Sequence, residues 1–339
     1  MSLTLSVVCP IYNEEKYIAK CIDSILEQDF PHDDWEILFV DGMSTDKTRD
    51  IISSYSVKYS FIRVLDNHMK IVPYAMNKGI EESTGSIIIR LDAHVIYPSN
   101  YFSILVKKLE EYNADNVGCV CNTLPVNDSA QAIAIAETLS SPFGVGNSMF
   151  RIGVERDMET DTVPFGGFRR DVFEKVGLYD LDLVRNQDDE LNARIINNGG
   201  KIILLSDLSC DYYARDKFSK LYKMYYQYGL YKPLVNKKLG KPATLRQLVP
   251  PLFLSGLVLG LVLSCIFPVL FIPYLIVIVL YIIMGLFIGS KVARKHHKFS
   301  LVFLMPISFL IVHIGYGWGY LNGIYKVVFG KSFSVQVNR

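Results

Sequence analysis

The sequence predicts an α/β fold with a mostly parallel central sheet, followed by interfacial helices and C-terminal transmembrane helices. Three observations support this fold class. Apolar, strand-like runs alternate with helical patterns over roughly the first 90 residues, as in α/β folds. Between Arg215 and Arg246, nine Lys or Arg stand against the single Asp216, among many aromatic residues. The 44 residues that follow, 247–290, carry no charged side chain.

Each predicted strand of the first part is followed by a polar turn. Ile18, Cys21, Ile22 and Ile25 recur at the spacing of a helix that packs on a sheet, and Asn13 is expected to cap that helix. No Gly-x-Gly-x-x-Gly or P-loop follows the first strand, which disfavours dinucleotide and P-loop chemistry. The predicted strands are residues 5–9, 36–41, 61–65 and 87–92, and residues 140–159 read as a loop.

Composition narrows the classes of partner and compartment. The formal net charge is +1, so nothing argues for nucleic acid as a partner. Six cysteines occur without a Cys-x-x-Cys pair, which favours a reducing cytoplasm. The first residues lack a basic region followed by an apolar run, so no cleaved signal peptide is expected.

Candidate binding residues follow two of the predicted strands. Asp92 and His94 are two residues apart, so a strand that kept its pleat to the end would point both to one side, where they could hold a divalent cation. A polar turn at the strand end is the alternative. Asp41 ends an earlier strand at the same sheet edge and could bind a base or ribose hydroxyl, or simply form the turn before Gly42.

Four short blocks in order resemble the signature of family 2 glycosyltransferases with the GT-A fold. They are Pro10-Ile11-Tyr12-Asn13-Glu14-Glu15, Val40-Asp41-Gly42-Met43-Ser44-Thr45-Asp46, Asn77-Lys78-Gly79-Ile80 with Thr84-Gly85, and Leu91-Asp92-Ala93-His94. The resemblance implies transfer of a sugar from a nucleoside diphosphate sugar. It also implies that the first loop and Asp41 surround the nucleoside, and that an Asp-x-Asp motif binds a cation on the diphosphate.

The chain departs from that signature at two places. Gly42 stands where the family has a second Asp, and His94 replaces the last residue of Asp-x-Asp. Imidazole is a softer ligand than carboxylate, so Mn²⁺ gains ground over Mg²⁺ as the cofactor. The candidate metal ligands are Asp92 and His94. The candidate donor-binding residues are Pro10, Tyr12, Glu14, Asp41, Asn77, Lys78, Arg90, Asp92, Gln227 and Lys232.

Two further blocks concern the acceptor. Residues 164–170 resemble the family's acceptor-lining segment and supply Gly166, Gly167, Phe168 and Arg169 as candidates. Residues 186–194 read Asn-Gln-Asp-Asp-Glu-Leu-Asn-Ala-Arg, which resembles the branch that includes succinoglycan-type exopolysaccharide glycosyltransferases.

The second block implies a general base for the acceptor hydroxyl. The matching residue is Asp188, and Asp189 is the fallback, because either acid could point inward from a helix. Acids that complement the helix dipole are the structural alternative. Glu190 and Arg194, four residues apart, are expected to pair on the surface. A single base without a carboxylate nucleophile gives one displacement, hence inversion at the anomeric carbon.

The C-terminal part is predicted to enter a membrane. Residues 247–290 suffice for two spans with a break near Pro268 or Pro273, and residues 299–325 form a third span or a re-entrant segment. The basic loop 291–298 and the catalytic domain are expected to face the cytoplasm at a bacterial-type inner (plasma) membrane. The predicted parts are a catalytic domain (1–210), interfacial helices (211–246), a transmembrane region (247–325) and a tail (326–339).

These observations favour a membrane-anchored inverting glycosyltransferase that acts in exopolysaccharide or cell-surface glycan synthesis. Its expected partners are a nucleoside diphosphate sugar, a lipid-linked or polysaccharide acceptor, membrane lipids and Mn²⁺ or Mg²⁺. One alternative is a polyprenyl phosphate glycosyltransferase, whose acceptor is the lipid phosphate itself. A non-catalytic nucleotide-binding membrane scaffold is the alternative from a different class.

Overall fold

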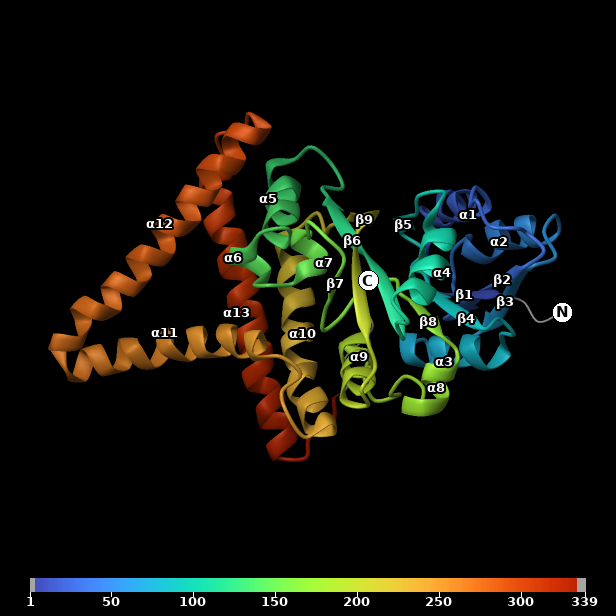
Figure 1. The fold of residues 1–339 in the computed structure, drawn as a ribbon. Coiled ribbons are helices and arrows are strands. Elements are labelled where there is room, and N and C mark those ends of the chain that lie inside the picture. The colour runs from blue at the N-terminus through green and yellow to red at the C-terminus, as the bar shows by residue number, and fades with distance from the viewer. Residues whose placement is uncertain (1–3, 334–339) are drawn as a thin grey trace. The chain divides into compact units, whose positions relative to one another are not determined.

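The computed structural model describes residues 4–333, and the chain divides into two compact units (Figure 1). Residues 4–122 and 153–212 form a sheet unit, and residues 123–152 and 213–333 form a helical unit. The prediction that no signal peptide is cleaved rests on the first residues of the chain. Of these, residues 1–3 lie outside the described residues. So do residues 334–339 of the predicted tail.

The first half of the sheet unit is a parallel sheet in the order β3-β2-β1-β4. Every residue of β1, β2 and β4 is buried, which is why their sequences read as continuous apolar runs. The strands are β1 (Leu5–Ile11), β2 (Trp35–Asp41), β3 (Ile62–Asp66) and β4 (Ile87–Arg90). The helices that connect them are α1 (Ile18–Leu26), α2 (Thr48–Ser56) and α3 (Val72–Glu82).

The second half of the same nine-stranded sheet is built from antiparallel pairs. Strand β8 lies between β4 and β6 and pairs antiparallel with both. The strands are β5 (Val95–Ile96), β6 (Asn116–Leu124), β7 (Met158–Glu159), β8 (Gly167–Arg169) and β9 (Ile202–Tyr213). The helices are α4 (Tyr101–Glu111), α8 (Asp171–Val176) and α9 (Gln187–Asn197). The predicted α/β class is confirmed.

A buried carboxylate holds the turn that leads into β4. Glu36 accepts hydrogen bonds from Ser6 Oγ (2.9 Å), from Thr84 N (2.7 Å) and from Thr84 Oγ1 (2.9 Å), and Arg63 pairs with its other oxygen at 3.0 Å. Gly85 lies so close to β1 that a Cβ there would be 2.5 Å from the backbone of Leu5. The Thr84-Gly85 pair is thus a structural feature of the sheet.

The helical unit contains the long apolar helices. Three are long and apolar enough to cross a membrane among the residues described: Leu245–Ile266, Pro268–His296 and Leu301–Val328. Its elements are α5 (Ala130–Leu139), α6 (Pro142–Val145), α7 (Met149–Ile152), α10 (Phe218–Leu239), η1 (Leu245–Leu248), α11 (Val249–Ile266), η2 (Pro268–Leu270), α12 (Phe271–His296) and α13 (Leu301–Val328). The loop predicted at 140–159 is therefore partly wrong, because α6, α7 and β7 fall within it.

Replacing Glu36 by Gln should destabilise the sheet unit by about 1–3 kcal/mol, because buried donors lose a charged acceptor. Burial raises the pKa of Glu36, but the hydrogen bonds from Thr84, Ser6 and Arg63 lower it by more than burial raises it. The net shift of the pKa is therefore downward. The charge therefore stabilises the fold at neutral pH, and this advantage is lost as the pH falls below the ordinary glutamate pKa and through the lower folded-state pKa. Urea unfolding in detergent, followed by the fluorescence of the adjacent buried Trp35, measures both effects.

The matched control is Glu82→Gln, which removes the exposed carboxylate 3.8 Å from the same Arg63. An equal loss of stability in both variants, or a Glu36→Gln effect that persists unchanged at low pH, would contradict the role given to the buried carboxylate.

Candidate active site

The carboxyl ends of the parallel strands bring polar residues into one row. Ile11, Asp41 and Asp66 are in register at the ends of β1, β2 and β3, and Arg90 at the end of β4 pairs with Val8. Open α/β sheets bind their ligands at this edge. The sheet topology therefore brings Asp41 and Arg90, predicted from separate parts of the sequence, to one edge of the sheet.

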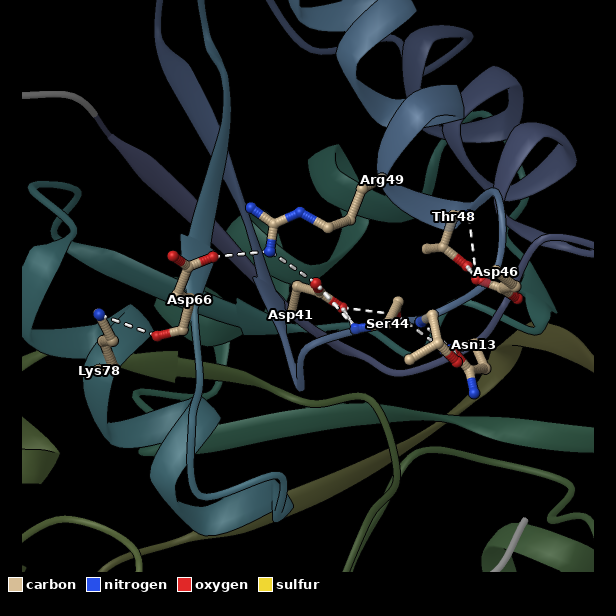
Figure 2. Close-up of polar contacts among 9 residues, drawn as sticks. Asn13, Asp41, Ser44, Asp46, Thr48, Arg49, Asp66 and Lys78 are labelled. Carbon is tan, nitrogen blue, oxygen red and sulfur yellow. Dashed lines mark hydrogen bonds and ion pairs between the residues drawn. The ribbon is translucent and has the colours of Figure 1, made fainter.

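Asp41 is fully buried and its carboxylate is occupied within the protein (Figure 2). Ser44 donates to it from its backbone N, at 3.1 Å, and from Oγ, at 2.6 Å. Arg49 donates to its second oxygen at 2.8 Å. Asp41 therefore shapes the 42–45 turn and fixes Arg49, while a direct contact with a nucleoside stays a prediction.

Arg49 and Asp66 are residues of this edge that the sequence analysis missed (Figure 2). Arg49 bridges Asp41 and Asp66, and its hydrogen bond to Asp66, 2.6 Å long, lowers the pKa of that carboxyl. Lys78 donates to the backbone oxygen of Asp66 at 2.9 Å. Asp66 had a usable signal, because it ends its strand as Asp41 does. Arg49 lies in the helix that follows and had no such signal.

The loop after β1 is tied to the loop after β2. Asn13 has a left-handed backbone (φ 54°); its N donates to Ser44 Oγ and its side chain accepts from Thr45 N, at 2.9 and 2.8 Å. The backbone N of Glu14 donates to Thr48 Oγ1 at 2.7 Å. The cap predicted for Asn13 is wrong, since α1 begins only at Ile18. Pro10 lies in β1, and a Cβ on Gly42 would be 3.4 Å from the Tyr12 ring.

Strand β4 ends at Arg90, two residues before the predicted end at Asp92. The Tyr97 hydroxyl accepts a hydrogen bond from Asp92 N at 2.9 Å, and His94 lies in a turn. Asp92 and His94 therefore do not share a strand that would point both side chains to one side. The alternative prediction, a polar turn after the strand, is confirmed.

The donor chemistry of this turn nevertheless suits a divalent cation. His94 Nδ1 lies 3.5 Å from Glu14 Oε1, and imidazole is a ligand that Mn²⁺ and similar divalent cations accept. The Asp92 and His94 side chains are 22% and 21% exposed, which leaves both reachable. No group of three His, Cys, Asp or Glu that could hold a metal occurs in the part of the chain that the structure describes. These two residues would thus need ligands from a bound substrate.

Arg90 connects the two halves of the candidate site. One guanidinium nitrogen lies 3.4 Å from an Asp92 oxygen, and the other nitrogen pairs with the carboxylate of Asp188 on α9. The Arg90 side chain is only 10% exposed. Burial alone lowers the pKa of Arg90, but the Asp92 charge raises it and the net direction is upward. Asp92, the candidate metal ligand, and Asp188, the candidate base, therefore both pair with the Arg90 guanidinium.

The first turn of α9 brings Asp188 to the end of β4. Its carboxylate pairs with Arg90, and its side chain is 35% exposed. Glu190 and Arg194 form the predicted ion pair, but the prediction that the pair lies on the surface is wrong. The Glu190 side chain is 4% exposed, and Arg194 also donates to the carbonyl oxygens of residues 176–178.

Asn77 holds the loop before α9. Its side-chain nitrogen donates to Tyr179 O and its oxygen accepts from Tyr179 N, each at 2.9 Å. Both ends of the amide are thus used within the protein. A contact between Asn77 and a donor stays a prediction.

The four predicted acceptor residues lie in or beside β8. Gly166 fits against Asn116, whose Oδ1 would be 2.2 Å from a Cβ, and Phe168 packs on Phe173 with ring centroids 5.4 Å apart. Arg169 donates to Leu109 O at 3.1 Å. These contacts, together with the burial of Gly167, are those of a central strand, and acceptor binding by these residues stays a prediction.

Gln227 and Lys232 are not among the residues of the sheet edge described above. Both belong to α10 of the helical unit, where Gln227 is buried and Lys232 is half-buried.

The mixed sheet, with its row of polar residues at the carboxyl edge, defines an α/β protein of the GT-A class. The family model described as "Glycosyl transferase family 2" matches residues 6–177. The chain belongs to this family, and both the predicted family and the predicted fold are confirmed. With its long apolar helices, the protein is a membrane-anchored glycosyltransferase.

Three known proteins illustrate the similarity. A dolichyl N-acetyl-α-D-glucosaminyl phosphate 3-β-D-2,3-diacetamido-2,3-dideoxy-β-D-glucuronosyltransferase of Methanococcus voltae is 32% identical, covering 69% of this chain and 74% of its own. The succinoglycan biosynthesis protein ExoA of Rhizobium meliloti is 30% identical over 72% and 73%. The mannosyltransferase PcManGT of Pyrobaculum calidifontis, solved with GDP-Man and Mn²⁺, has a TM-score of 0.60, with 18% identity over 94% and 88% of the chains.

Replacing Asp41 by Asn should weaken nucleotide binding about tenfold, equivalent to about 1.4 kcal/mol, because Arg49 and Ser44 lose a charged acceptor. Calorimetric titration with UDP and with GDP, each with Mn²⁺, measures the effect. Asp66→Asn is the control, since it removes only the half-exposed partner of Arg49 and should change affinity less. Unchanged affinity in Asp41→Asn would show that this network does not shape the nucleotide site.

Proposed function

We propose that the protein is an inverting, metal-dependent glycosyltransferase that moves one sugar from a nucleoside diphosphate donor to a lipid-linked glycan. The observation that carries the proposal is the Arg90 guanidinium, which pairs with both Asp92 and Asp188. Transfer requires a base close to the acceptor oxygen and positive charge close to the leaving diphosphate. Asp188 and the Asp92 turn would supply these two parts within one small region.

The proposed chemistry is a single displacement. Asp188 accepts the proton of the acceptor hydroxyl as its oxygen attacks the anomeric carbon, and the bond from that carbon to the diphosphate breaks with its electron pair. The ion pair with Arg90 holds the Asp188 carboxylate in place. No second carboxylate is required, which is why inversion is proposed.

Asp92 and His94 would hold the divalent cation, with Mn²⁺ favoured over Mg²⁺. When bound, such a cation neutralises charge on the diphosphate. Glu14 Oε1, 3.5 Å from His94 Nδ1, would orient the imidazole when the cation is bound, as carboxylates orient metal-binding imidazoles in many sites. PcManGT was solved with Mn²⁺ and a nucleotide sugar, which supports the same cofactor class here.

The nucleoside end of the donor would occupy the edge formed by the 10–14 loop and the end of β2. Tyr12, Asp41 and Lys78 remain the candidate contacts from the sequence. Arg49 and Asp66 join them as residues that set the charge of this edge.

The acceptor is proposed from the relatives and the membrane helices. The Methanococcus voltae relative is named for transfer to a dolichyl phosphate-linked N-acetylglucosamine, and ExoA for succinoglycan biosynthesis. Three apolar helices would keep this protein beside a membrane-borne acceptor and raise its effective concentration. We place the catalytic part and the basic 291–298 loop on the cytoplasmic side. Purified protein given bare polyprenyl phosphate as acceptor tests the alternative, because product formation there would favour a polyprenyl phosphate glycosyltransferase.

Asp188→Asn should lower kcat by roughly 100-fold or more, because the amide accepts no proton. Donor affinity, measured separately by calorimetry, should stay unchanged. Asp189→Asn is the matched control, one residue along the same helix turn, and should keep most of the activity. Full turnover in Asp188→Asn would eliminate Asp188 as the base, and a larger loss in Asp189→Asn would transfer that role to Asp189.

His94→Asp should shift the cation preference from Mn²⁺ towards Mg²⁺, because a carboxylate is a harder ligand than imidazole. The measurement is the ratio of transfer rates with the two cations, together with Mn²⁺ binding by electron paramagnetic resonance in the presence of UDP or GDP. A variant whose ratio and Mn²⁺ affinity both match the parent protein would remove His94 from the cation site.

A further inference from the structure

Helix α10 runs alongside the second half of α13, and both belong to the helical unit (Figure 1). The contact is backbone to backbone. A Cβ on Gly319 would be 2.1 Å from Tyr226 O, and one on Gly323 would be 2.3 Å from Leu230 O. The two helices run in the same direction, since residues 222, 226 and 230 meet residues 315, 319 and 323 in order.

Helix α5 covers the first half of α13. Ile133 and Ala134 pack with Leu301, Met305 and Phe309 in one buried cluster. A second cluster places Val312 against three further residues of α5: Ile135, Ala136 and Leu139. Neighbouring helices therefore accompany α13 from its first turn to residue 323.

These neighbouring helices carry charge. Glu137 on α5 pairs with Lys295 and His296 at 2.8 and 2.7 Å. Lys223 on α10 is exposed, one residue from the Tyr222 carbonyl that faces Gly315. If α13 crossed a bilayer, these helices would have to enter the hydrocarbon with it, and charged side chains there are costly. The other lysines of α10 are Lys220, Lys232, Lys237 and Lys238.

The large apolar side chains that α13 exposes recur at helical spacing. Phe303, Ile307, Leu310, Trp318 and Tyr325 follow one another at intervals of three, four, seven or eight residues, and they are 56%, 47%, 38%, 54% and 52% exposed. Ile324 and Val328, in the last turns, are exposed as well. These side chains lie on one side of the helix in two groups, before and after the place where Gly317 meets α11, while Gly315, Gly319 and Gly323 face α10. A helix with one apolar stripe and polar surroundings on its other side suits the plane of a membrane surface.

Helix α11 contacts α13 at its first turn, and α12 contacts α13 from Tyr281, whose hydroxyl lies 2.8 Å from His313 Nδ1, towards its end. A Cβ on Gly317 would be 2.6 Å from Pro250 O in the first turn of α11, and one on Gly289, two turns before the end of α12, would be 2.6 Å from Val302 O. Figure 1 shows both helices extending away from α13 to a common tip. At that tip Phe267 and Val269 are 54% and 79% exposed. Helix α13 therefore links the start of α11 to the last turns of α12.

We infer that α11 and α12 are the membrane spans and that α13 lies in the plane of the membrane surface, with its exposed stripe on lipid. The stripe is the set Phe303, Ile307, Leu310, Trp318 and Tyr325, and its partner is the bilayer into which α11 and α12 insert. Lysines of α10 complement anionic headgroups beside it. The end of α13 then lies on the same side as the 291–298 loop. This inference does not depend on the catalytic proposal.

Trp318 reports the depth of α13 directly. The chain has two tryptophans, and Trp35 is 1% exposed in the sheet unit, so Trp35→Phe leaves Trp318 as the sole reporter. In vesicles of phosphatidylcholine and phosphatidylglycerol, we expect lipids brominated near the headgroup to quench it more than lipids brominated near the chain ends. A spanning α13 would hold Trp318 about 5 Å from the midplane and reverse that order, which would overturn the inference.

The side on which α13 ends gives an independent measurement. Cys265 is the exposed cysteine among those described and the other five are buried, so Cys265→Ser provides the background. Single variants Lys331→Cys, Arg294→Cys and Val269→Cys are then labelled with a membrane-impermeant maleimide in oriented vesicles. We expect Lys331→Cys to react from the same side as Arg294→Cys and opposite to Val269→Cys. Reaction of Lys331→Cys from the Val269 side would overturn the inference, and retained transfer activity confirms that each variant folds.

Discussion

The candidate active site depends on one buried cation. Arg90 ends the fourth strand, and its guanidinium would be costly to bury without nearby negative charge. Asp92, two residues away, and Asp188, almost a hundred residues away, supply that charge. The fold therefore brings the end of β4 and the start of α9 to the same guanidinium. The proposed mechanism uses the same pair of positions, because one must face the leaving group and the other the attacking oxygen.

The motif residues of the proposed nucleoside site also have a structural role, which the sequence motif alone does not show. Asp41, Asn13 and Asn77 each satisfy backbone or side-chain partners in a neighbouring loop. Such bonds fix the loops before any ligand arrives, which reduces the conformational entropy lost on binding. A polar residue at a strand end can therefore be essential to a site without contacting the ligand itself.

The parallel half of the sheet was predictable, because the local pattern of apolar residues predicts each buried strand and the helix that follows it. Three of the four motif blocks lie at the carboxyl edge for the same reason, whereas Thr84-Gly85 of the third block lies at the amino end of β4. What sequence alone did not give were pairings between distant residues. The bridge from Arg49 to Asp66, the early end of β4 at Arg90, and the burial of the Glu190–Arg194 pair all depend on elements that fold in from elsewhere. Local periodicity carries no information about such partners.

The helical unit shows the same limit for membranes. Hydropathy adds up residues along a helix, so a helix that lies on lipid along one stripe can score as highly as one surrounded by lipid. Helix α13 has a buried fraction of 39% over its most apolar window, against 11% and 6% for the windows in the other two helices. The difference comes from α5 and α10, whose apolar faces cover α13 while their charges remain outside. Glycines at 315, 319 and 323 permit the close cover by α10. Met305, Phe309 and Val312 pack against α5, and these apolar side chains add to the hydropathy of α13 as lipid-facing ones would. The packing that would keep α13 at the surface is thus part of what makes its sequence resemble a crossing.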